Sequence, residues 1–294
     1  MENIQQGTDV VFERLVAARR EHVVALQKAQ SKELADLETR GQSRLASLKK
    51  SLPKELAAYL TQQEEAESKV AAAALKDSET AAARLAEAEA SESTALQLVL
   101  GNGPAAAAVG WLSPYYGTLH GSDGSVYWQG YNPGNIDASC YANGAGSGIF
   151  GTGVGSFTVY MDWWFTFNAP ENRNYAQTVY VPFNGFYIVR ADDGWFDSKQ
   201  ANVDISLSAT GYQYNYKPTG NANVLSVGND NINVNDRFDG WRTMYYSDLL
   251  GADRAYLLVS AKLSVYARGG GSTAQLDFAS GNANYLGVPL VYVS

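Results

Sequence analysis

The sequence is poor in the side chains from which most catalytic and metal sites are built. It has one cysteine, Cys140, and two histidines, His22 and His120. One cysteine excludes a disulfide within the chain, and so few thiols and imidazoles cannot supply a tetrahedral zinc site. A nucleophile–histidine pair in the second half of the chain would have to use His120. We therefore predict no catalytic residue, no metal site and no cofactor, and expect that the protein is not an enzyme.

Long apolar runs and an excess of positive charge are also missing. No stretch of about 18 or more apolar residues occurs, so stable membrane insertion is not expected. The net charge is −8, which argues against a nucleic-acid partner. The first residues show no basic segment followed by an apolar one, so no secretory signal is predicted. We expect synthesis in the cytoplasm, with a virion or extracellular location reached only after assembly or lysis.

What the sequence does contain changes sharply near residue 100. The first 100 residues hold 29 of the 52 charged residues, two of the 28 glycines and two of the 35 aromatic residues. Alanine-, leucine- and charge-rich segments favour long helices, whereas glycine- and aromatic-rich segments favour short strands joined by turns. The sequence predicts a helical coiled-coil stalk at 1–100, a neck at 101–120 and a β-sandwich head at 121–294.

Large apolar residues recur every 11 positions in the helical half, in two series offset by three. Eleven residues per three turns predict a nearly straight or weakly right-handed coiled coil, and such a stripe needs a partner helix. We predict a homo-oligomer, with a trimer as the expected state, in which this stripe is the contact. The predicted oligomerisation residues are Phe12, Val23, Leu34, Leu45 and Leu56 in one series, and Leu15, Leu26, Leu37, Leu48 and Tyr59 in the other.

Pro53 interrupts this helix, because proline lacks the amide hydrogen that an internal turn requires. Leu56 and Tyr59 keep the register beyond it, which favours a bent continuation over a reversal. A polar run at 61–69 follows, and an alanine-rich segment continues to residue 98. A kink or hairpin is expected near 51–69, and whether 61–98 folds back or extends the stalk stays open.

Beyond residue 120, apolar and polar residues alternate with a period of two, which is typical of strands with one buried face. Several such runs predict eight to ten strands in an antiparallel, jelly-roll-like sandwich, with the final strand in the core sheet. Asn184-Gly185 indicates a hairpin turn. The clearest alternating runs are 156–167, 203–209, 257–265, 274–278 and 288–293.

The segment Val179-Tyr-Val-Pro-Phe-Asn-Gly185-Phe-Tyr-Ile-Val189 resembles a strand pair of the C1q/TNF-like jelly-roll domains. The resemblance covers about these 11 residues. It implies a trimeric head on a helical or fibrous stalk, and a head that binds a receptor or a sugar.

Two further segments suggest ligand chemistry but lack its context. Gly146–Gly151 matches G-x-G-x-x-G, yet a strand is predicted after it rather than a helix, so it is no dinucleotide site. The Asn/Asp-rich segment 228–239 keeps calcium open as a cofactor, although its spacing is not that of an EF-hand loop. A carboxylate pair for glycoside hydrolysis also stays open, because sequence does not give their separation.

Aromatic residues are in surplus on positions opposite the core stripe and beside turns. Flat rings next to Asp and Asn side chains are typical of sugar-binding surfaces, while packing on a neighbouring subunit would use the same side chains. The candidate ligand-binding residues are Tyr160, Asp162, Trp164, Trp195, Trp128 and Tyr131.

These patterns favour a non-enzymatic, self-assembling structural or adhesion protein with a stalk and a head. Such a protein fits a fibre or spike of a virion or surface appendage, with a host glycan or receptor as the head's partner. One alternative is a pore-forming or injected toxin whose helices rearrange at membranes. Another is a glycan-acting enzyme built on a β-sandwich.

Overall fold

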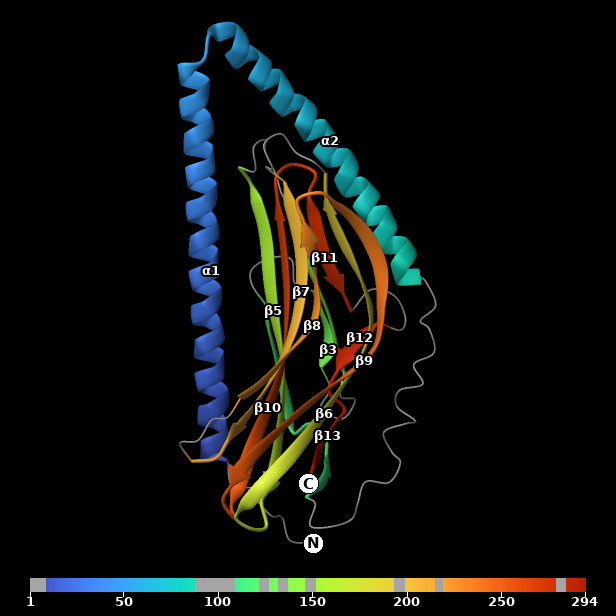
Figure 1. Cartoon of the computed structure of the whole chain (residues 1–294). Helices are drawn as coiled ribbons and strands as arrows, with labels where there is room; N and C mark the ends of the chain where they lie inside the picture. Colours follow the sequence, from blue (N-terminus) through green and yellow to red (C-terminus); the bar gives the residue numbers. More distant parts are fainter. Residues whose placement is uncertain are drawn as a thin grey trace.

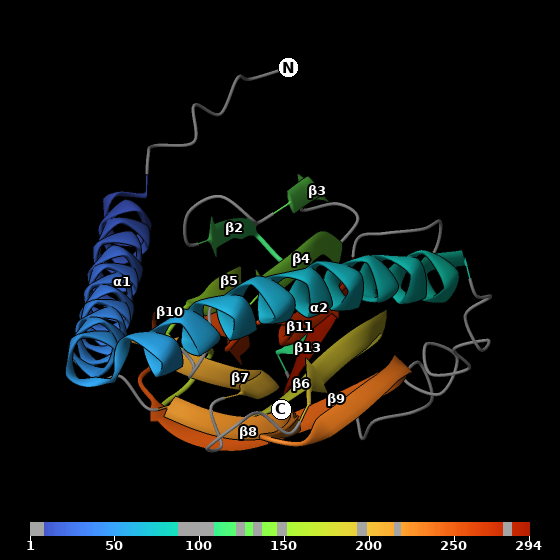
Figure 2. The ribbon, with the colours of Figure 1, turned by 90° about the horizontal axis from the view of Figure 1, so that it is seen from above.

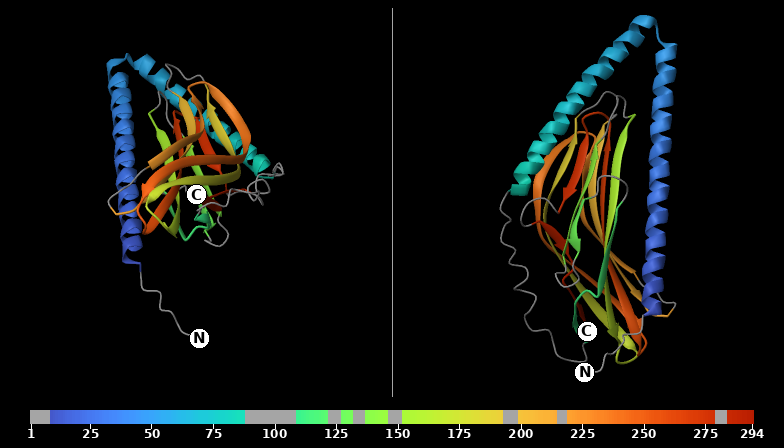
Figure 3. Two further views of the ribbon diagram at one scale, coloured as in Figure 1. Left: turned by 60° about the horizontal axis from the view of Figure 1, so that its bottom comes forward. Right: turned by 180° about the vertical axis from the view of Figure 1, so that it is seen from behind.

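The computed structural model describes residues 9–87, 109–121, 127–131, 137–145, 152–192, 199–214, 219–278 and 284–294, with the backbone alone for 127–131 and 137–145. Two long helices precede a sandwich of antiparallel strands, as predicted. The helices meet at an apex and descend along two sides of the sandwich (Figure 1). Views from behind and from below show the same arrangement (Figure 3).

The sandwich consists of two sheets. One sheet has the order β1-β13-β6-β11-β4-β12, with β3 added beside β4 and β9 beside β6. Its strands are β1 (Gly110–Leu112), β3 (Tyr127–Tyr131), β4 (Asp137–Ala145), β6 (Arg173–Ala191), β9 (Ile232–Leu250), β11 (Thr273–Asp277), β12 (Tyr285–Gly287) and β13 (Leu290–Val293). The other sheet has the order β2-β5-β10-β7-β8. Its strands are β2 (Tyr116–Gly121), β5 (Val154–Asn168), β7 (Gln200–Tyr212), β8 (Thr219–Asn229) and β10 (Arg254–Arg268).

The alternation of side chains explains where the core lies. On β5, Met161, Trp163 and Phe165 point between the sheets and are buried. The inward residues of β7 and β10 meet them there, as the period of two predicts. The C-terminal strand β13 pairs with β6 and β1, so it belongs to the core sheet as expected.

Two details of the head differ from the sequence predictions. Residues 110–112 and 116–121 of the predicted neck are strands β1 and β2, so the sandwich begins before residue 121. Asn184-Gly185 forms no hairpin, because β6 runs straight through it. Gly185 instead allows a close approach: a Cβ there would lie 2.5 Å from the Asp277 carbonyl oxygen. This removes the strand pair on which the C1q/TNF resemblance was based.

The helices are α1 (Val10–Ser51) and α2 (Lys54–Glu87). Asp9 caps α1 by accepting a hydrogen bond from the Phe12 amide at 3.1 Å. Leu52 is extended, as the residue before a proline prefers, and α2 then turns back along the far side of the sandwich (Figure 1). The expected bent continuation is therefore wrong, because an extended residue at 52 breaks the helix.

The alanine-rich face of α2 packs on the sandwich rather than on α1. The Ala71 and Ala74 atoms lie 3.5–3.6 Å from a Cβ built on Gly271, in the turn before β11. Ser78 is buried and hydrogen-bonds to Thr273 of β11. Seen from above, α2 crosses over β11 (Figure 2). Small residues permit this close contact.

The two 11-residue series of α1 have different environments. In the first series, Phe12 and Val23 are buried against the chain's own sandwich, and Leu34 and Leu45 are half-buried. The second series is largely open to solvent, since Leu15 is half-buried while its later members are 40–46% exposed. Those members are Leu26, Leu37, Leu48 and Tyr59, and Leu56 of the first series is 50% exposed. For the first series, the sandwich takes the place of a partner helix. The predicted coiled coil therefore stays a prediction.

Candidate functional site

Three of the candidate ligand-binding residues lie where the sequence placed them, on the outer face of β5. None of the three is open to a ligand on this chain, since Tyr160 is 9%, Asp162 1% and Trp164 0% exposed. Helix α1 covers them. Phe12 packs edge-on against Trp164 with ring centroids 5.7 Å apart, and Arg19 lies 5.3 Å from the Tyr160 ring centroid.

A buried ion pair fixes α1 on this face. The Arg19 guanidinium donates to both Asp162 oxygens at 2.8 and 3.0 Å, and to the Ser260 hydroxyl at 2.9 Å. His120 of β2 lies 3.8 Å from the same carboxylate. Burial lowers the pKa of His120, and the nearby arginines add to this effect while Asp162 opposes it. These groups hold the helix on the sheet and are not placed to react with a ligand from solvent.

The other three candidate residues are not brought into this cluster by any described contact. Trp195 lies outside the described residues. Trp128 and Tyr131 lie on β3, whose backbone pairs with β4, and their side chains are outside the described part of the structure. Their predicted role stays a prediction.

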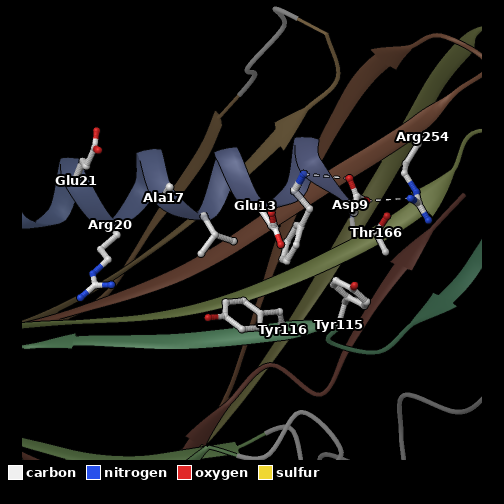
Figure 4. A pocket seen from close by; sticks show the side chains of 11 residues that line it. Asp9, Glu13, Ala17, Arg20, Glu21, Tyr115, Tyr116, Thr166 and Arg254 are labelled. Carbon is white, nitrogen blue, oxygen red and sulfur yellow. Dashed lines mark hydrogen bonds and ion pairs between the residues drawn. The ribbon is translucent and has the colours of Figure 1, made fainter. Parts of the chain in front are cut away.

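A different site appears at the start of α1, where the helix meets the edge of the five-stranded sheet. A cavity of about 890 Å³ opens there, between the first three turns of α1 and the segment that leads into β2 (Figure 4). Its wall includes Tyr115 and Tyr116 below the helix, and Thr166 and Arg254 from β5 and β10. We call this cavity the tyrosine pocket.

The aromatic wall of the tyrosine pocket is held by Phe12. Its ring makes edge-to-face contacts with Tyr115 and Tyr116 at centroid distances of 5.0 and 5.7 Å. The Tyr115 amide also donates to the Trp164 carbonyl at 2.7 Å, which ties this segment to β5. Tyr115 nevertheless remains 53% and Tyr116 38% exposed. Both rings are therefore held in place and still keep surface that a ligand can reach.

Charged and hydroxyl groups surround these rings. Asp9 accepts from Arg254 at 2.9 Å and from the Tyr256 hydroxyl at 2.7 Å. Burial opposes its charge, but the hydrogen bonds from Tyr256 and Phe12 and the charge of Arg254 outweigh burial and lower the pKa of Asp9. The Thr166 hydroxyl is buried at the pocket wall and has no hydrogen-bond partner among the described residues.

Three more charged residues of α1 line the same pocket, namely Glu13, Arg20 and Glu21. Together with Asp9 and Arg254 they give three carboxylates and two guanidiniums, a nearly balanced set. Rings offer flat apolar faces, and such polar groups direct hydrogen bonds, which suits a neutral ligand rich in hydroxyl groups. The sequence did contain the adjacent tyrosines, but only the fold shows that Phe12, more than 100 residues away, supports them.

The described residues contain no group of three or more His, Cys, Asp and Glu side chains placed to hold a metal ion. The Asn/Asp-rich segment 228–239 forms the end of β8, the turn after it and the start of β9, which pairs with β6. Neither α1 nor α2 is long and apolar enough to cross a membrane.

No protein-family model matches the sequence, and no curated protein matches it either. Among solved structures, TmCBM61 in complex with β-1,4-galactotriose has 8% identity and a TM-score of 0.22, with 61% of this chain and 88% of that chain covered. BiXyn10A CBM1 has 9% identity and a TM-score of 0.23, with 62% and 98% covered. Tailspike protein 4 of bacteriophage CBA120 has 10% identity and a TM-score of 0.19, with 60% and 19% covered. Likenesses this distant do not indicate what the chain binds. A functional inference therefore rests on the geometry of the tyrosine pocket.

Proposed function

We propose that this chain is a non-enzymatic, self-assembling adhesion protein whose tyrosine pocket binds a neutral glycan. The observation that carries the proposal is the pair of exposed rings, Tyr115 and Tyr116, in the wall of a cavity that three carboxylates and two guanidiniums also line. Sugar rings present patches of C–H groups that pack on aromatic faces, and their hydroxyl groups both donate and accept hydrogen bonds. A fibre or spike of a virion or a surface appendage is the setting that such a protein fits.

The carboxylate of Asp9 favours binding over hydrolysis. A glycosidase needs one carboxyl group with a raised pKa to protonate the leaving oxygen. Asp9 has the opposite property, since its hydrogen bonds and the charge of Arg254 lower its pKa. Both of its oxygens are also engaged by Arg254, Tyr256 and the Phe12 amide. In this proposal Asp9 holds the start of α1 against the sheet and shapes the pocket.

The test is glycan binding by the full chain and by a matched pair of variants. A panel of neutral glycans is first screened on an array, and the best binder is then titrated by calorimetry. Replacing Tyr116 with alanine should weaken binding about tenfold, because one stacking face is lost. Tyr245 is 67% exposed on β9, away from the pocket, so Tyr245→Ala should leave binding unchanged.

Two results would contradict the proposal. One is equal affinity of Tyr116→Ala and the unchanged protein for the selected glycan, with circular dichroism showing both folded. The other is the absence of binding to any neutral glycan on the array. Release of reducing sugar during the titration would contradict the non-enzymatic part alone.

A further inference from the structure

A second cavity, of about 420 Å³, lies on the other helix, between the last turns of α2 and strands β6 and β9. It is remote from the tyrosine pocket, which α1 lines. Its chemical character is also different. Arg84 and Asp77 of α2 line one wall, and Arg190, Asn233 and Asn235 of the sheet line the other.

The sheet wall is set by strand register. Arg190 on β6 lies directly opposite Asn233 on β9, and Ile188 lies opposite Asn235. Residues two apart on a strand share a face, so the guanidinium of Arg190 and the two amides lie on the same side of the sheet. Three potential donors to an anion are thereby brought together.

The helix wall is held on the sheet by two contacts that flank the cavity. The Leu85 carbonyl accepts a hydrogen bond from the Arg237 guanidinium at 3.1 Å. About two turns earlier, Ser78 is buried against Thr273. Arg84 and Asp77 lie immediately beside these two anchored residues. The cavity is therefore built on fixed elements rather than on a loop.

The charges in this cavity are unpaired. Among the residues that the structure describes, neither Arg84 nor Arg190 forms an ion pair or a hydrogen bond, and the Nε atom of Arg190 is buried without an acceptor. A buried donor without a partner is costly, and a guanidinium binds carboxylates through a pair of parallel hydrogen bonds. Two guanidiniums and the single carboxylate of Asp77 leave one positive charge, in a chain whose net charge is −8.

We propose that this cavity, formed by Arg84, Arg190, Asn233 and Asn235, binds one carboxylate-bearing sugar residue. A monoanion neutralises the single surplus positive charge. A dianion such as phosphate would leave one excess negative charge beside the carboxylate of Asp77. The two asparagine amides suit the hydroxyl groups of the same sugar. The site does not depend on the tyrosine pocket and goes beyond the neutral glycan proposed for it.

The experiment compares D-glucuronate with D-glucuronamide, a ligand of nearly the same shape without the charge. Each is titrated into the full chain and followed by saturation-transfer NMR. The protein should bind glucuronate about tenfold more tightly than glucuronamide, because a hydrogen bond between charged groups is stronger than one between a guanidinium and a neutral amide. Arg84 is exposed, so Arg84→Gln should keep the fold and abolish this preference. Asp77→Asn should strengthen glucuronate binding, since it removes the competing carboxylate.

Tyr116→Ala serves as the control that separates the two sites, because it should leave glucuronate binding unchanged. Equal binding of the two sugars, or a preference that survives in Arg84→Gln, would overturn the proposal. Tighter binding of inorganic phosphate than of glucuronate would overturn the assignment to a carboxylate.

Discussion

At the residue scale, the contact that fixes α1 on the sandwich is the pair between Arg19 and Asp162. The carboxylate has no exposed surface, and it accepts two hydrogen bonds from one guanidinium. Removing one partner of a buried ion pair leaves the other charge without compensation, which typically costs about 3 kcal/mol or more. The same pair makes the face of Tyr160 and Trp164 inaccessible, so it decides which aromatic residues can meet a ligand.

The first prediction tests this pair by removing its acid. Asp162→Ala should lower the free energy of unfolding by about 3 kcal/mol, measured by urea denaturation followed by circular dichroism. The double variant Arg19→Met, Asp162→Ala should recover a large part of the loss, because no unpaired charge remains. A single variant as stable as the unchanged protein would show that α1 is not held here.

The second prediction concerns Asp248, whose side chain is buried on β9. Burial raises its pKa to about 6, although a hydrogen bond from Gln177 opposes the rise. The folded state therefore holds the proton more tightly than the unfolded state, where the ordinary value is 3.8. Its contribution to stability is complete below about pH 4 and is lost as the pH rises through 6.

Replacing Asp248 with asparagine should consequently stabilise the protein at pH 8, by about 1 kcal/mol, and have little effect at pH 4. Urea denaturation at the two pH values measures the difference. Asp253 supplies a control of opposite sign, because hydrogen bonds from the Arg254 amide and Tyr214 lower its pKa. Asp253→Asn should lose stability toward pH 8 rather than gain it. The same pH profile for both variants would contradict the assignment.

At the element scale, Asn184-Gly185 in β6 shows that the same dipeptide can occur for two different structural reasons. Asn-Gly favours a tight hairpin turn, but glycine is also required where a neighbouring chain comes too close for a Cβ. A Cβ on Gly185 would lie 2.5 Å from both the Asp277 carbonyl oxygen and a ring carbon of Phe278. The close approach of β11 requires glycine at position 185, and the sequence around this position does not show that approach.

The third prediction uses this contact. Gly185→Ala should lower the free energy of unfolding by about 2 kcal/mol or more, because backbone atoms of β11 cannot move aside without breaking the sheet. Gly251→Ala is the matched control, since a Cβ there would have no neighbour nearer than 3.5 Å. Thermal melts of the two variants give the comparison. Equal melting temperatures would contradict the claim that the close approach of β11 requires glycine at position 185.

The elements that could be predicted are those whose patterns depend on their own residues. The alternation in β5 correctly divided Trp163, which faces the core, from Trp164, which faces outward. The 11-residue series correctly identified a long helix with a sided surface. The residues of an outward face do not indicate which element covers that face. The sequence therefore could not show that α1 lies on Trp164. The tyrosine pocket was missed for the same reason, because Tyr115 and Tyr116 form a site only with Phe12 above them.

At the scale of the whole molecule, the two helices lie along two sides of the sandwich instead of extending from it (Figures 1 and 3). The apex is closed by an ion pair between Lys49 of α1 and Glu64 of α2. Each helix separately contacts one sheet, α1 at Asp162 and α2 at Thr273. This arrangement uses the first apolar series of α1 inside the chain and leaves the second available for another copy, as the proposed self-assembly requires.

The final prediction separates these two uses of the stripe. Size exclusion with light scattering should give a mass that is a multiple of 31.7 kDa. Replacing Leu26 and Leu37 with aspartate should reduce the mass to one chain while the melting temperature changes little, because both side chains are 40–41% exposed. Val23→Asp is the control, since Val23 has no exposed surface and a buried charge there should destabilise the fold itself. A single-chain mass for the unchanged protein would leave the exposed leucines without a partner and would reject self-assembly through α1.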